Sequence, residues 1–254
     1  MTFIDTHTHL YLEDFNTDIS DVMERAFDAG VESFYLPAID STESEALLSL
    51  EKKYPGKIHA MAGLHPCSVK ENYREELELV EKQLDQRKFA ALGETGLDFY
   101  WDTSFTKQQY ESLHRHAEWA LQYNRPIVLH TRNATQQTID VMKPYAARGL
   151  RGIFHCFGGS AAEAKEIVGL GFALGIGGVI TFKNAGLQQA LADIGLEHLV
   201  LETDAPYLSP VPYRGKRNES SYLPYIAQKL AEIKKIDVEQ VASITTNNAK
   251  RIFS

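Results

Sequence analysis

Short apolar runs alternate with longer amphipathic stretches along the whole chain. The runs show little polar alternation, which is typical of strands that a parallel sheet buries on both faces. The stretches between them carry apolar residues at helical spacing, and the first of them ends at Gly30, a residue type that commonly stops a helix. The predicted strands cover residues 3–6, 31–39, 58–64, 89–93, 127–129, 152–154, 172–176 and 199–201.

Helical segments follow these strands in regular succession. Each strand and its helix span about 30 residues, the size of one βα unit, and the chain holds eight such units. This number predicts an α/β fold in the form of a closed (β/α)8 TIM barrel rather than an open doubly wound sheet. Because no linker or low-complexity tract interrupts the succession, we expect a single domain over residues 1–254. The predicted helices cover residues 18–29, 41–54, 74–87, 106–123, 135–145, 161–170, 187–194, 220–235 and 238–252.

Histidine and carboxylate side chains directly follow six of the eight predicted strands. In a barrel, the carboxyl ends of the strands converge on one mouth, where active sites are built. We therefore expect these side chains to meet at one place. They are His7 and His9 after the first strand, His65 after the third, Glu94 after the fourth, His130 after the fifth, His155 after the sixth and Asp204 after the eighth.

His7 and His9 are separated by one residue in an extended segment. Residues i and i+2 of a strand project to the same face, so both imidazoles can reach one metal ion. His114 and His116 have the same spacing, but they lie in a predicted helix, where residues two apart do not face each other. We interpret the first pair as metal ligands and the second as a solvated or packing pair.

The residue types of this set predict its metal chemistry. Neutral imidazoles and carboxylates suit Zn²⁺, Mn²⁺, Fe²⁺, Mg²⁺ or a similar divalent ion. Four histidines and two carboxylates exceed what one tetrahedral ion uses, and they suit two ions about 3.5–4 Å apart that share a bridging carboxylate. Asp204 is then a candidate to ligate one ion and to accept the proton of the nucleophilic water. The alternative is a capping role before Ala205 and Pro206.

Basic and aromatic residues near the same mouth are candidates for substrate contacts. Arg132 closely follows the fifth strand, and Lys183 and Asn184 follow the seventh. A basic loop over residues 214–217, which includes Arg214, follows the eighth. With the aromatic residues near the mouth, these groups would form a small stacking and phosphate-binding surface. The aromatic residues are Phe99, Tyr100, Trp101 and Tyr207.

Three further residues near these strands have open or structural interpretations. His65 precedes Pro66 and either contacts the substrate or caps the third strand. Cys156 follows His155, so we expect its side chain to point away from the mouth and to pack in the barrel wall. Cys67 has no activating neighbour that the sequence identifies, and two cysteines imply no disulfide framework.

Composition and charge narrow the classes of function. Of the 254 residues, 44% are hydrophobic and 24% are charged, which excludes an intrinsically disordered chain. The net charge of −8 argues against a long, sequence-independent grip on duplex nucleic acid, so any such contact is expected to be short. The sequence shows no signal peptide and no apolar run of the ~20 residues that a membrane span needs. We expect a monomeric cytoplasmic protein without a membrane partner.

At the mouth residues the sequence resembles the TatD family of metal-dependent hydrolases. The matching segments occur in order and span essentially the whole chain, and as a set they are highly specific. Many related amidohydrolases have a modified lysine at the fourth strand, where this chain has Glu94. The segments are IDTHTH at 4–9, GLHP at 63–66, ALGETGLD at 91–98, VLHTR at 128–132, FHCFGG at 154–159 and LETDAPYL at 201–208.

The resemblance implies a (β/α)8 barrel with a two-metal centre and deoxyribonuclease or related phosphodiesterase activity. It implies that Glu94 bridges two ions and that Asp204 belongs to the ligands of the first. It also places His65 and Arg214 near the scissile phosphate. By the same resemblance, the first ion is held by His7, His9, Glu94 and Asp204, and the second by Glu94, His130 and His155.

Three functions remain open at this point. The first is hydrolysis of phosphodiester bonds in DNA, at an accessible or single-stranded end, by water activated between two ions, with Glu94 and Asp204 as the catalytic carboxylates. The second is hydrolysis of a small amide, ester or lactone at the same metal centre. The third is a non-catalytic module that binds metal or nucleic acid. The basic loop at 214–217 favours a phosphate substrate, and the complete ligand set argues against the non-catalytic module.

Overall fold

The computed structural model describes residues 1–183 and 186–254, so Asn184 lies outside the described residues. Each predicted apolar run contains all or part of one observed strand, and several of these strands are shorter than the run. The strands are β1 (Phe3–Asp5), β2 (Val31–Leu36), β3 (Ile58–Ala60), β4 (Leu92–Asp98), β5 (Ile127–Arg132), β6 (Gly152–Phe154), β7 (Ala173–Ile176) and β8 (Leu199–Leu201).

The strands close into one barrel. All strand pairs are parallel, in the orders β1–β2–β3 and β4–β5–β6–β7–β8. Between β3 and β4, Ala62 and Leu92 form a parallel bridge. Between β8 and β1, the N–H of Thr6 donates to the carbonyl of Leu201 at 3.1 Å. The prediction of a (β/α)8 barrel is therefore confirmed.

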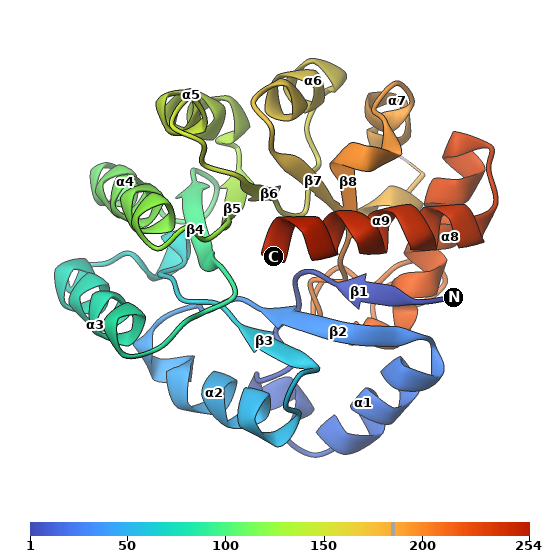
Figure 1. The fold of residues 1–254 in the computed structure, drawn as a ribbon, viewed down its shortest axis with the longest axis horizontal. Helices are drawn as coiled ribbons and strands as arrows, with labels where there is room; N and C mark the ends of the chain where they lie inside the picture. The colour runs from blue at the N-terminus through green and yellow to red at the C-terminus, as the bar shows by residue number, and fades with distance from the viewer. Residues whose placement is uncertain (184–185) are drawn as a thin grey trace.

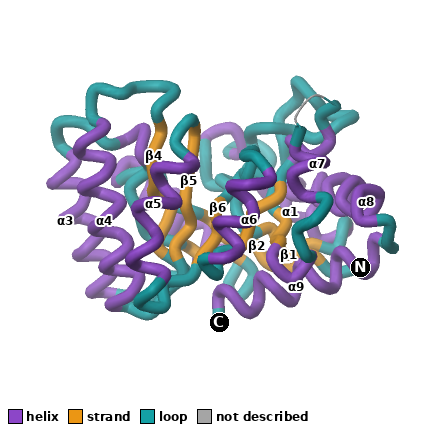
Figure 2. The backbone as a smooth tube through the Cα atoms, turned by 90° about the horizontal axis from the view of Figure 1, so that it is seen from above, coloured by secondary structure: helices purple, strands orange, loops and turns teal. Residues whose placement is uncertain are grey.

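Helices surround the strands, and the two ends of the barrel differ (Figures 1 and 2). Helix α9 crosses the amino-terminal end, close to both chain termini, whereas the loops that follow the strands gather at the opposite end. None of the helices in the described part of the chain has both the length and the apolar character needed to cross a bilayer. The helices are α1 (Ile19–Asp28), α2 (Ser44–Lys53), α3 (Tyr73–Gln86), α4 (Thr106–Gln122), α5 (Thr135–Ala146), α6 (Ala161–Gly169), α7 (Leu187–Leu191), α8 (Leu223–Lys234) and α9 (Val238–Phe253).

One layer of apolar side chains joins all eight strand segments and forms its own cluster, separate from the larger core that includes the surrounding helices. Ala249 and Ile252 of α9 complete this cluster, so the helix plugs the amino-terminal end of the barrel. Side chains of barrel strands alternate between interior and exterior, which explains why neighbouring residues such as Val128 and Leu129 belong to different clusters. The interior layer consists of Ile4, Tyr35, Met61, Ala91, Val128, Ile153, Ala173 and Val200.

The fourth strand differs from the prediction. The sequence places it at residues 89–93 with Glu94 after it, but β4 covers Leu92–Asp98 and contains Glu94. Its register against β5 is irregular between Leu92 and Thr95. This segment does not show the apolar pattern of a buried strand, because Glu94 and Asp98 line the cleft described below instead of packing in the core. Periodicity therefore ended the predicted strand too early.

Candidate metal centre

Glu94 lies at the centre of a cluster of imidazoles at the carboxyl ends of the strands. Its carboxylate is buried, with 2% of its side chain exposed. One oxygen, Oε1, is 2.8 Å from His130 Nδ1 and 2.9 Å from His155 Nε2. The other, Oε2, is 3.1 Å from His7 Nε2 and 3.7 Å from His9 Nε2. One carboxylate thus faces imidazoles from three different parts of the barrel, which is the arrangement that a bridging ligand requires.

His7 and His9 lie in the loop after β1 and present the same nitrogen to the cluster. Their Nε2 atoms are 3.3 Å apart, and the Oδ1 atom of Asp204 is 3.7 Å from His7 Nε2 and 3.5 Å from His9 Nε2. Backbone bonds hold this loop against the loop after β8: the N–H of Asp204 donates to His7 O at 2.9 Å, and that of His9 to Ala205 O at 2.7 Å. The two loops therefore act as one unit.

Asp5, at the end of β1, helps to hold together the loops that follow β1 and β8. Its buried carboxylate accepts hydrogen bonds from the hydroxyl of Thr203 at 2.6 Å and from that of Ser220 at 2.7 Å. Burial raises the pKa of Asp5 to about 7, against the opposing effect of these donors. Asp5 is a positioning residue and is not among the predicted site residues, although it precedes the His7–His9 pair by two residues.

Hydrogen bonds determine which nitrogen of His9 faces the cluster. The hydroxyl of Tyr11 donates to the carbonyl of Pro37 at 2.6 Å, so its oxygen is free to accept. The Nδ1–H of His9 lies 3.1 Å from this oxygen and donates to it. Because Nδ1 carries the proton, Nε2 presents a lone pair to the space between Glu94 and Asp204.

His130 is fixed in the same way by Asp98, the last residue of β4. Its Nε2 lies 2.9 Å from Asp98 Oδ2, and its Nδ1 faces Glu94. Burial opposes ionisation of Asp98, but its hydrogen bonds with His130, Trp101 and Tyr100 hold its pKa well below the usual value. An ionised Asp98 accepts the Nε2 proton and leaves the Nδ1 lone pair for a metal, a common arrangement around ligating histidines.

Glu202 occupies the corresponding position behind His155. It is fully buried, and its Oε1 atom lies 3.3 Å from His155 Nδ1, an ion-pair distance rather than a well-formed hydrogen bond. The same oxygen accepts the N–H of Cys156. Glu202 and Asp98 both lie at barrel strand ends, and neither is among the predicted site residues. The signal that could have identified them is their closeness in sequence to the predicted carboxylates Asp204 and Glu94.

His65 has a different proton arrangement from the other imidazoles. Its Nδ1 accepts the backbone N–H of Cys67 at 3.0 Å, so the neutral ring carries its proton on Nε2, which lies 3.3 Å from Glu94 Oε1. Distances alone group His65, Glu94 and His130 as a set that could hold an ion. The proton on Nε2 argues against this, and it makes His65 a hydrogen-bond donor directed at the cluster.

The electrostatics of the cluster favour bound cations. Burial opposes ionisation of Glu94, yet the neighbouring imidazoles, led by His155, hold its pKa well below the usual value. Burial also opposes ionisation of Asp204, and His9, His155 and His7 together lower its pKa. Both carboxylates are therefore charged in a buried place, where positive charge stabilises them strongly.

The residues present fit divalent metal ions. The donor atoms of two sets, His7–His9–Glu94 and His7–His155–Asp204, lie within 4.8 Å of one another in each set. Imidazole nitrogens and carboxylate oxygens are the donors that Zn²⁺, Mn²⁺ and Fe²⁺ accept. The proton positions on His9 and His130 leave the inward nitrogens free, as ligation requires. We therefore interpret the cluster as a candidate metal centre.

The cluster forms the floor of an open cleft of about 740 Å³. His65 and Arg132, both predicted substrate contacts, line this cleft, as do Trp101 and Tyr207. Of the predicted ligands, all except His7 line it directly, since His7 is fully buried behind the others. The structure thus brings eight of the nine predicted site residues to one place.

Two expectations about the mouth require correction. Cys156 lines the cleft instead of packing in the barrel wall. Its backbone has φ of +46°, and β6 has already ended at Phe154, so the alternation of strand side chains does not apply to it. Burial raises the pKa of its thiol above its usual value.

The basic loop at 214–217 contributes less to the cleft than expected. Arg214 is not among the described residues that line the cleft, and its guanidinium lies 4.2 Å from the ring centroid of Phe182. Arg217 forms an ion pair with Asp18 at 2.6 Å, which ties the loop to the start of α1. No sequence pattern indicates these partners, because Phe182 and Asp18 are distant from the loop along the chain.

The other histidine pair is structural, as the helical spacing indicated. His116 is fully buried in α4, where its Nε2 accepts the N–H of Leu64 at 3.1 Å. His114 is exposed, and its Nδ1 lies 2.8 Å from the hydroxyl of Tyr145. One member of the pair therefore packs and the other faces solvent.

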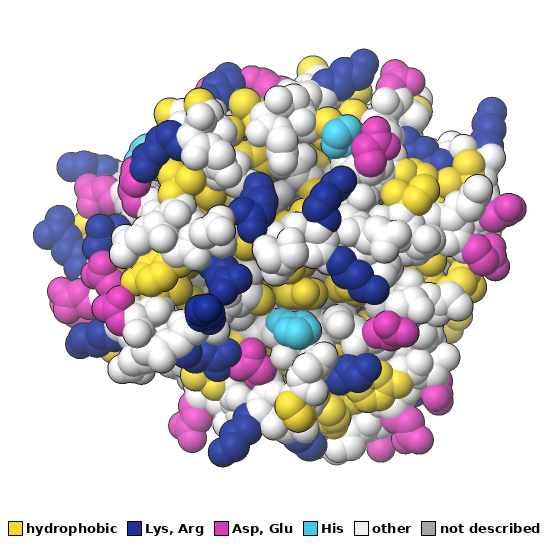
Figure 3. Space-filling view, viewed as in Figure 1, with side chains coloured by type: hydrophobic (Ala, Val, Ile, Leu, Met, Phe, Trp, Pro, Cys, Tyr) yellow, Lys and Arg dark blue, Asp and Glu magenta, His cyan; other side chains and the backbone are white. Residues whose placement is uncertain are grey.

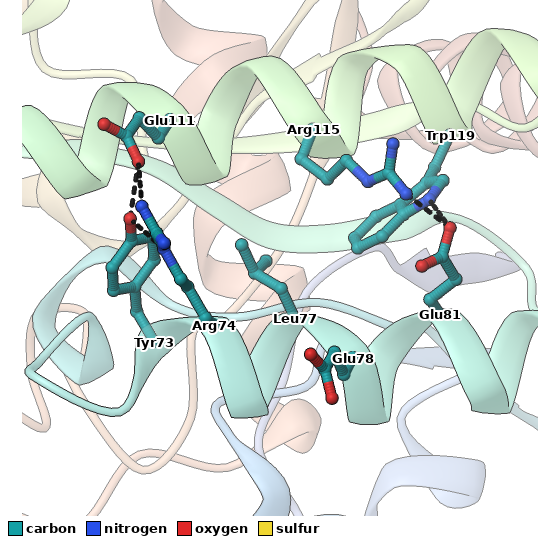
Figure 4. Close-up of a pocket in the computed structure, with 8 residues that line it drawn as sticks. All are labelled: Tyr73, Arg74, Leu77, Glu78, Glu81, Glu111, Arg115 and Trp119. Carbon is teal, nitrogen blue, oxygen red and sulfur yellow. Dashed lines mark hydrogen bonds and ion pairs between the residues drawn. The ribbon is translucent and has the colours of Figure 1, made fainter.

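A second, smaller hollow of about 340 Å³ lies between α3 and α4 (Figure 4). Most of its charged groups are already paired within the hollow: Arg115 with Glu81 and Arg74 with Glu111. No histidine or cysteine is found among the described residues that line it. This hollow therefore offers no chemistry comparable to that of the cleft.

Comparison with known proteins gives a consistent result. Residues 4–254 match the family described as TatD related DNase. An uncharacterized metal-dependent hydrolase of Bacillus subtilis is 39% identical over 98% of both chains. A 3′-5′ ssDNA/RNA exonuclease of Erwinia tasmaniensis is 31% identical over 98% of this chain and 99% of its own.

Solved structures show the same relationship at the level of the fold. The TatD homologue YjjV of Escherichia coli is 29% identical and superposes with a TM-score of 0.93, over 99% of this chain and 97% of its own. A TatD family hydrolase of Entamoeba histolytica superposes with a TM-score of 0.83 at 22% identity, over 99% of this chain and 98% of its own. The chain belongs to the TatD family of metal-dependent hydrolases.

Proposed function

We propose that the protein is a metal-dependent nuclease that hydrolyses phosphodiester bonds at an end of single-stranded DNA. The observation that carries this proposal is the buried Glu94, which faces imidazoles on both of its oxygens at the floor of an open cleft. The name of the Erwinia tasmaniensis relative supports a single-stranded substrate and hydrolysis in the 3′-to-5′ direction.

The ligands are assigned to two ions as the family resemblance implies. His7, His9, Glu94 and Asp204 would hold one ion, and Glu94, His130 and His155 the other. When bound, such ions lower the pKa of water and neutralise charge on a phosphoryl group.

The remaining side chains of the cleft have roles that follow from their protonation and charge. Asp204 is ionised and partly accessible from the cleft, so its carboxylate can accept the proton of the attacking water. His65 presents Nε2–H to the floor and can donate to a phosphate oxygen there. Arg132 is exposed at the mouth and can pair with a phosphate of the same strand.

The test is cleavage of a 5′-labelled and a 3′-labelled single-stranded oligonucleotide by purified protein. We expect a ladder of products from one end, loss of cleavage with a chelator, and recovery with an added divalent ion. Glu94→Ala removes the shared ligand and should abolish cleavage while the circular dichroism spectrum is retained. Full activity of a folded Glu94→Ala protein would contradict the two-metal assignment.

The competing function is hydrolysis of a small amide, ester or lactone, because carbonyl and phosphoryl substrates use the same metal-activated water. A panel of simple esters and lactones, tested with the same metal-loaded preparation, separates the two. Turnover of the panel without oligonucleotide cleavage would overturn the nuclease proposal. Tight oligonucleotide binding without turnover in any divalent metal would instead support the non-catalytic module.

A further inference from the structure

Exposed apolar side chains gather on two loops at the mouth of the cleft. In the described part of the chain, Trp101 is 67% exposed and Tyr100 52% exposed on the loop after β4. Tyr207 is 51% exposed and Leu208 41% exposed on the loop after β8. Trp101, Tyr207 and Leu208 line the cleft directly above the metal centre. Exposure of large apolar groups beside an active-site cleft is typical of a ligand-binding surface.

The loop that carries Trp101 is held in place although its side chain is exposed. Asp98 Oδ1 accepts the backbone N–H groups of Tyr100 at 2.9 Å and of Trp101 at 3.0 Å. Next to them, Lys70 forms an ion pair with Asp102 at 2.6 Å. The indole is therefore presented to the cleft on a fixed backbone, and Asp98 connects this backbone to His130 in the metal centre.

Arg132 lies against Tyr100 and Trp101 and carries a charge that can bind a phosphate beside them. Its guanidinium lies 4.0 Å from the ring centroid of Tyr100 and 5.2 Å from that of Trp101. The two rings meet edge to face, with centroids 4.9 Å apart. Within the described residues Arg132 forms no ion pair, so its charge is available to a phosphate while its flat face supports the rings.

Tyr207 faces the cleft from the opposite loop and is also held by the backbone. Its N–H donates to Asp204 O at 2.8 Å, and its carbonyl accepts from the side-chain amide of Asn218 at 2.6 Å. Its ring meets that of His9 edge-on at 6.0 Å. The phenol thus lies between the metal ligands and solvent, where a nucleotide attached to the scissile phosphate would pass.

We infer that Trp101 and Tyr207 form an aromatic subsite that stacks the unpaired terminal bases of a single-stranded nucleic acid, with Arg132 pairing the adjacent phosphate. The inference rests on the proposed function. Stacking is tolerant of base identity but requires bases that are not paired, because only unpaired bases expose their faces. A cleft of about 740 Å³ has the size of a small-molecule site, which suits one or two nucleotides and not a duplex.

The test compares base-bearing with abasic strand ends. The probes are a six-nucleotide oligothymidylate and the same strand with tetrahydrofuran abasic residues at its last two 3′ positions. Trp101→Ala should raise KM for the base-bearing strand by roughly 5- to 150-fold, the range for loss of one stacked base, and should leave KM for the abasic strand unchanged. Trp101→Phe should retain most of the affinity. Phe27→Ala, which removes a 37% exposed aromatic ring from α1, is the matched control and should not alter KM.

Fluorescence gives a second readout that does not depend on turnover. Trp101 is exposed and the only other tryptophan, Trp119, is buried, so stacking on the oligothymidylate should quench the exposed component of emission. The measurement uses chelator-treated protein, so that the strand stays intact. Quenching that is absent in Trp101→Ala, and weaker with the abasic strand, would support the subsite.

The outcomes separate this inference from the proposed function. Base-dependent quenching without cleavage of any strand would support the subsite and overturn the nuclease activity. Cleavage with equal KM values for Trp101→Ala and wild type would overturn the subsite and leave the nuclease activity standing. An equal rise of KM for base-bearing and abasic strands would also overturn it, because Trp101 would then act only on the shape of the loop.

Discussion

Side chains behind the metal centre decide which nitrogen each imidazole presents. Tyr11 holds His9, Asp98 holds His130 and Glu202 lies behind His155. Such partners fix the ring and the position of its proton, and their loss typically reduces metal affinity by about 10- to 100-fold. We therefore expect substitutions of these partner side chains to lower the affinity for the ions more than the stability of the fold.

Glu202→Gln tests this role. The variant keeps the volume, and its single oxygen can still face both the N–H of Cys156 and His155 Nδ1, but the neutral amide no longer stabilises the proton on Nδ1 as a carboxylate does. His155 should then be held less firmly in the form that ligates through Nε2, and metal affinity measured by calorimetric titration should fall by about 10- to 100-fold with little change in the circular dichroism spectrum. Glu197→Gln, an exposed carboxylate on the opposite rim, is the control and should bind metal as wild type does. Equal affinity of the two variants would contradict the role of Glu202.

His116 should make stability depend on pH. Burial lowers its pKa to about 4, from the usual 6.5, while its hydrogen bond to the carbonyl of Ser112 acts in the opposite direction. Below pH 6.5 the unfolded chain binds a proton that the folded protein does not, so the contribution of His116 to stability is full above that pH and is lost as the pH falls toward 4. The loss amounts to about 3 kcal/mol across this range.

Urea denaturation of chelator-treated protein at pH 7.5 and pH 5 measures this effect. The free energy of unfolding of His116→Gln should change less between the two pH values than that of wild type. The exposed His114→Gln should keep the wild-type dependence. The assignment fails if both variants lose it equally or if neither does.

At the scale of elements, the contact between β4 and β5 places Glu94 beside His130. Gly96 of β4 pairs with His130 of β5 and has φ of +148°. A Cβ atom at Gly96 would lie 2.0 Å from the His130 carbonyl oxygen, so a side chain there must separate the strands. The close approach of these two strands is therefore part of the metal centre.

Gly96→Ala should lower the free energy of unfolding by more than about 2 kcal/mol, because it combines a steric clash with an unfavourable φ. It should also weaken metal binding. Gly169→Ala is the matched control: Gly169 ends α6, and no atom lies within 4 Å of a Cβ there outside the helix's own backbone. Its stability should be equal to wild type or slightly higher. Similar unfolding energies for the two variants in urea would refute the argument.

The elements also show where sequence patterns succeed and fail. The strands β6 and β8 have the predicted bounds, because each is a short run buried on both faces. The strand β4 was displaced in the prediction because its residues alternate between core and cleft. In helix α4, the helical spacing of His114 and His116 argued against a metal site, and the structure agrees. The contact of His116 with Leu64, 52 positions away in the chain, could not be predicted from this spacing.

For the whole molecule, the metal centre joins strands from opposite sides of the barrel. The proposed ligands come from β4 and β5 and from the loops after β1, β6 and β8. Bound ions should therefore stabilise the folded protein, by about 2.7 kcal/mol at a concentration 100 times the Kd. The measurement is the Tm of chelated and metal-loaded protein. Glu94→Gln should show a much smaller shift, and a full shift in this variant would place the stabilising ion elsewhere.

The distribution of charge over the whole molecule favours a short contact with the proposed substrate. The net charge is −8, yet the face crossed by α9 carries Lys and Arg side chains across its middle (Figure 3). That face is the amino-terminal end of the barrel, whereas the residues that line the cleft lie at the carboxyl ends of the strands. Among the described residues that line the cleft there is a single Arg, Arg132, and no Lys. A short contact with a strand end therefore suits the molecule better than an extended duplex footprint.

The sequence by itself determined the barrel and the residue types of its site. Eight repeated βα units define the order of the strands, and residues that follow strands must meet at one mouth whatever the details of packing. The tertiary structure alone decided the partners: which nitrogen of His9 or His130 faces inward, that Cys156 lines the cleft, and that Arg214 lies over Phe182. These features depend on single hydrogen bonds and backbone angles between distant segments. Periodicity averages over many residues, so it carries no information about them.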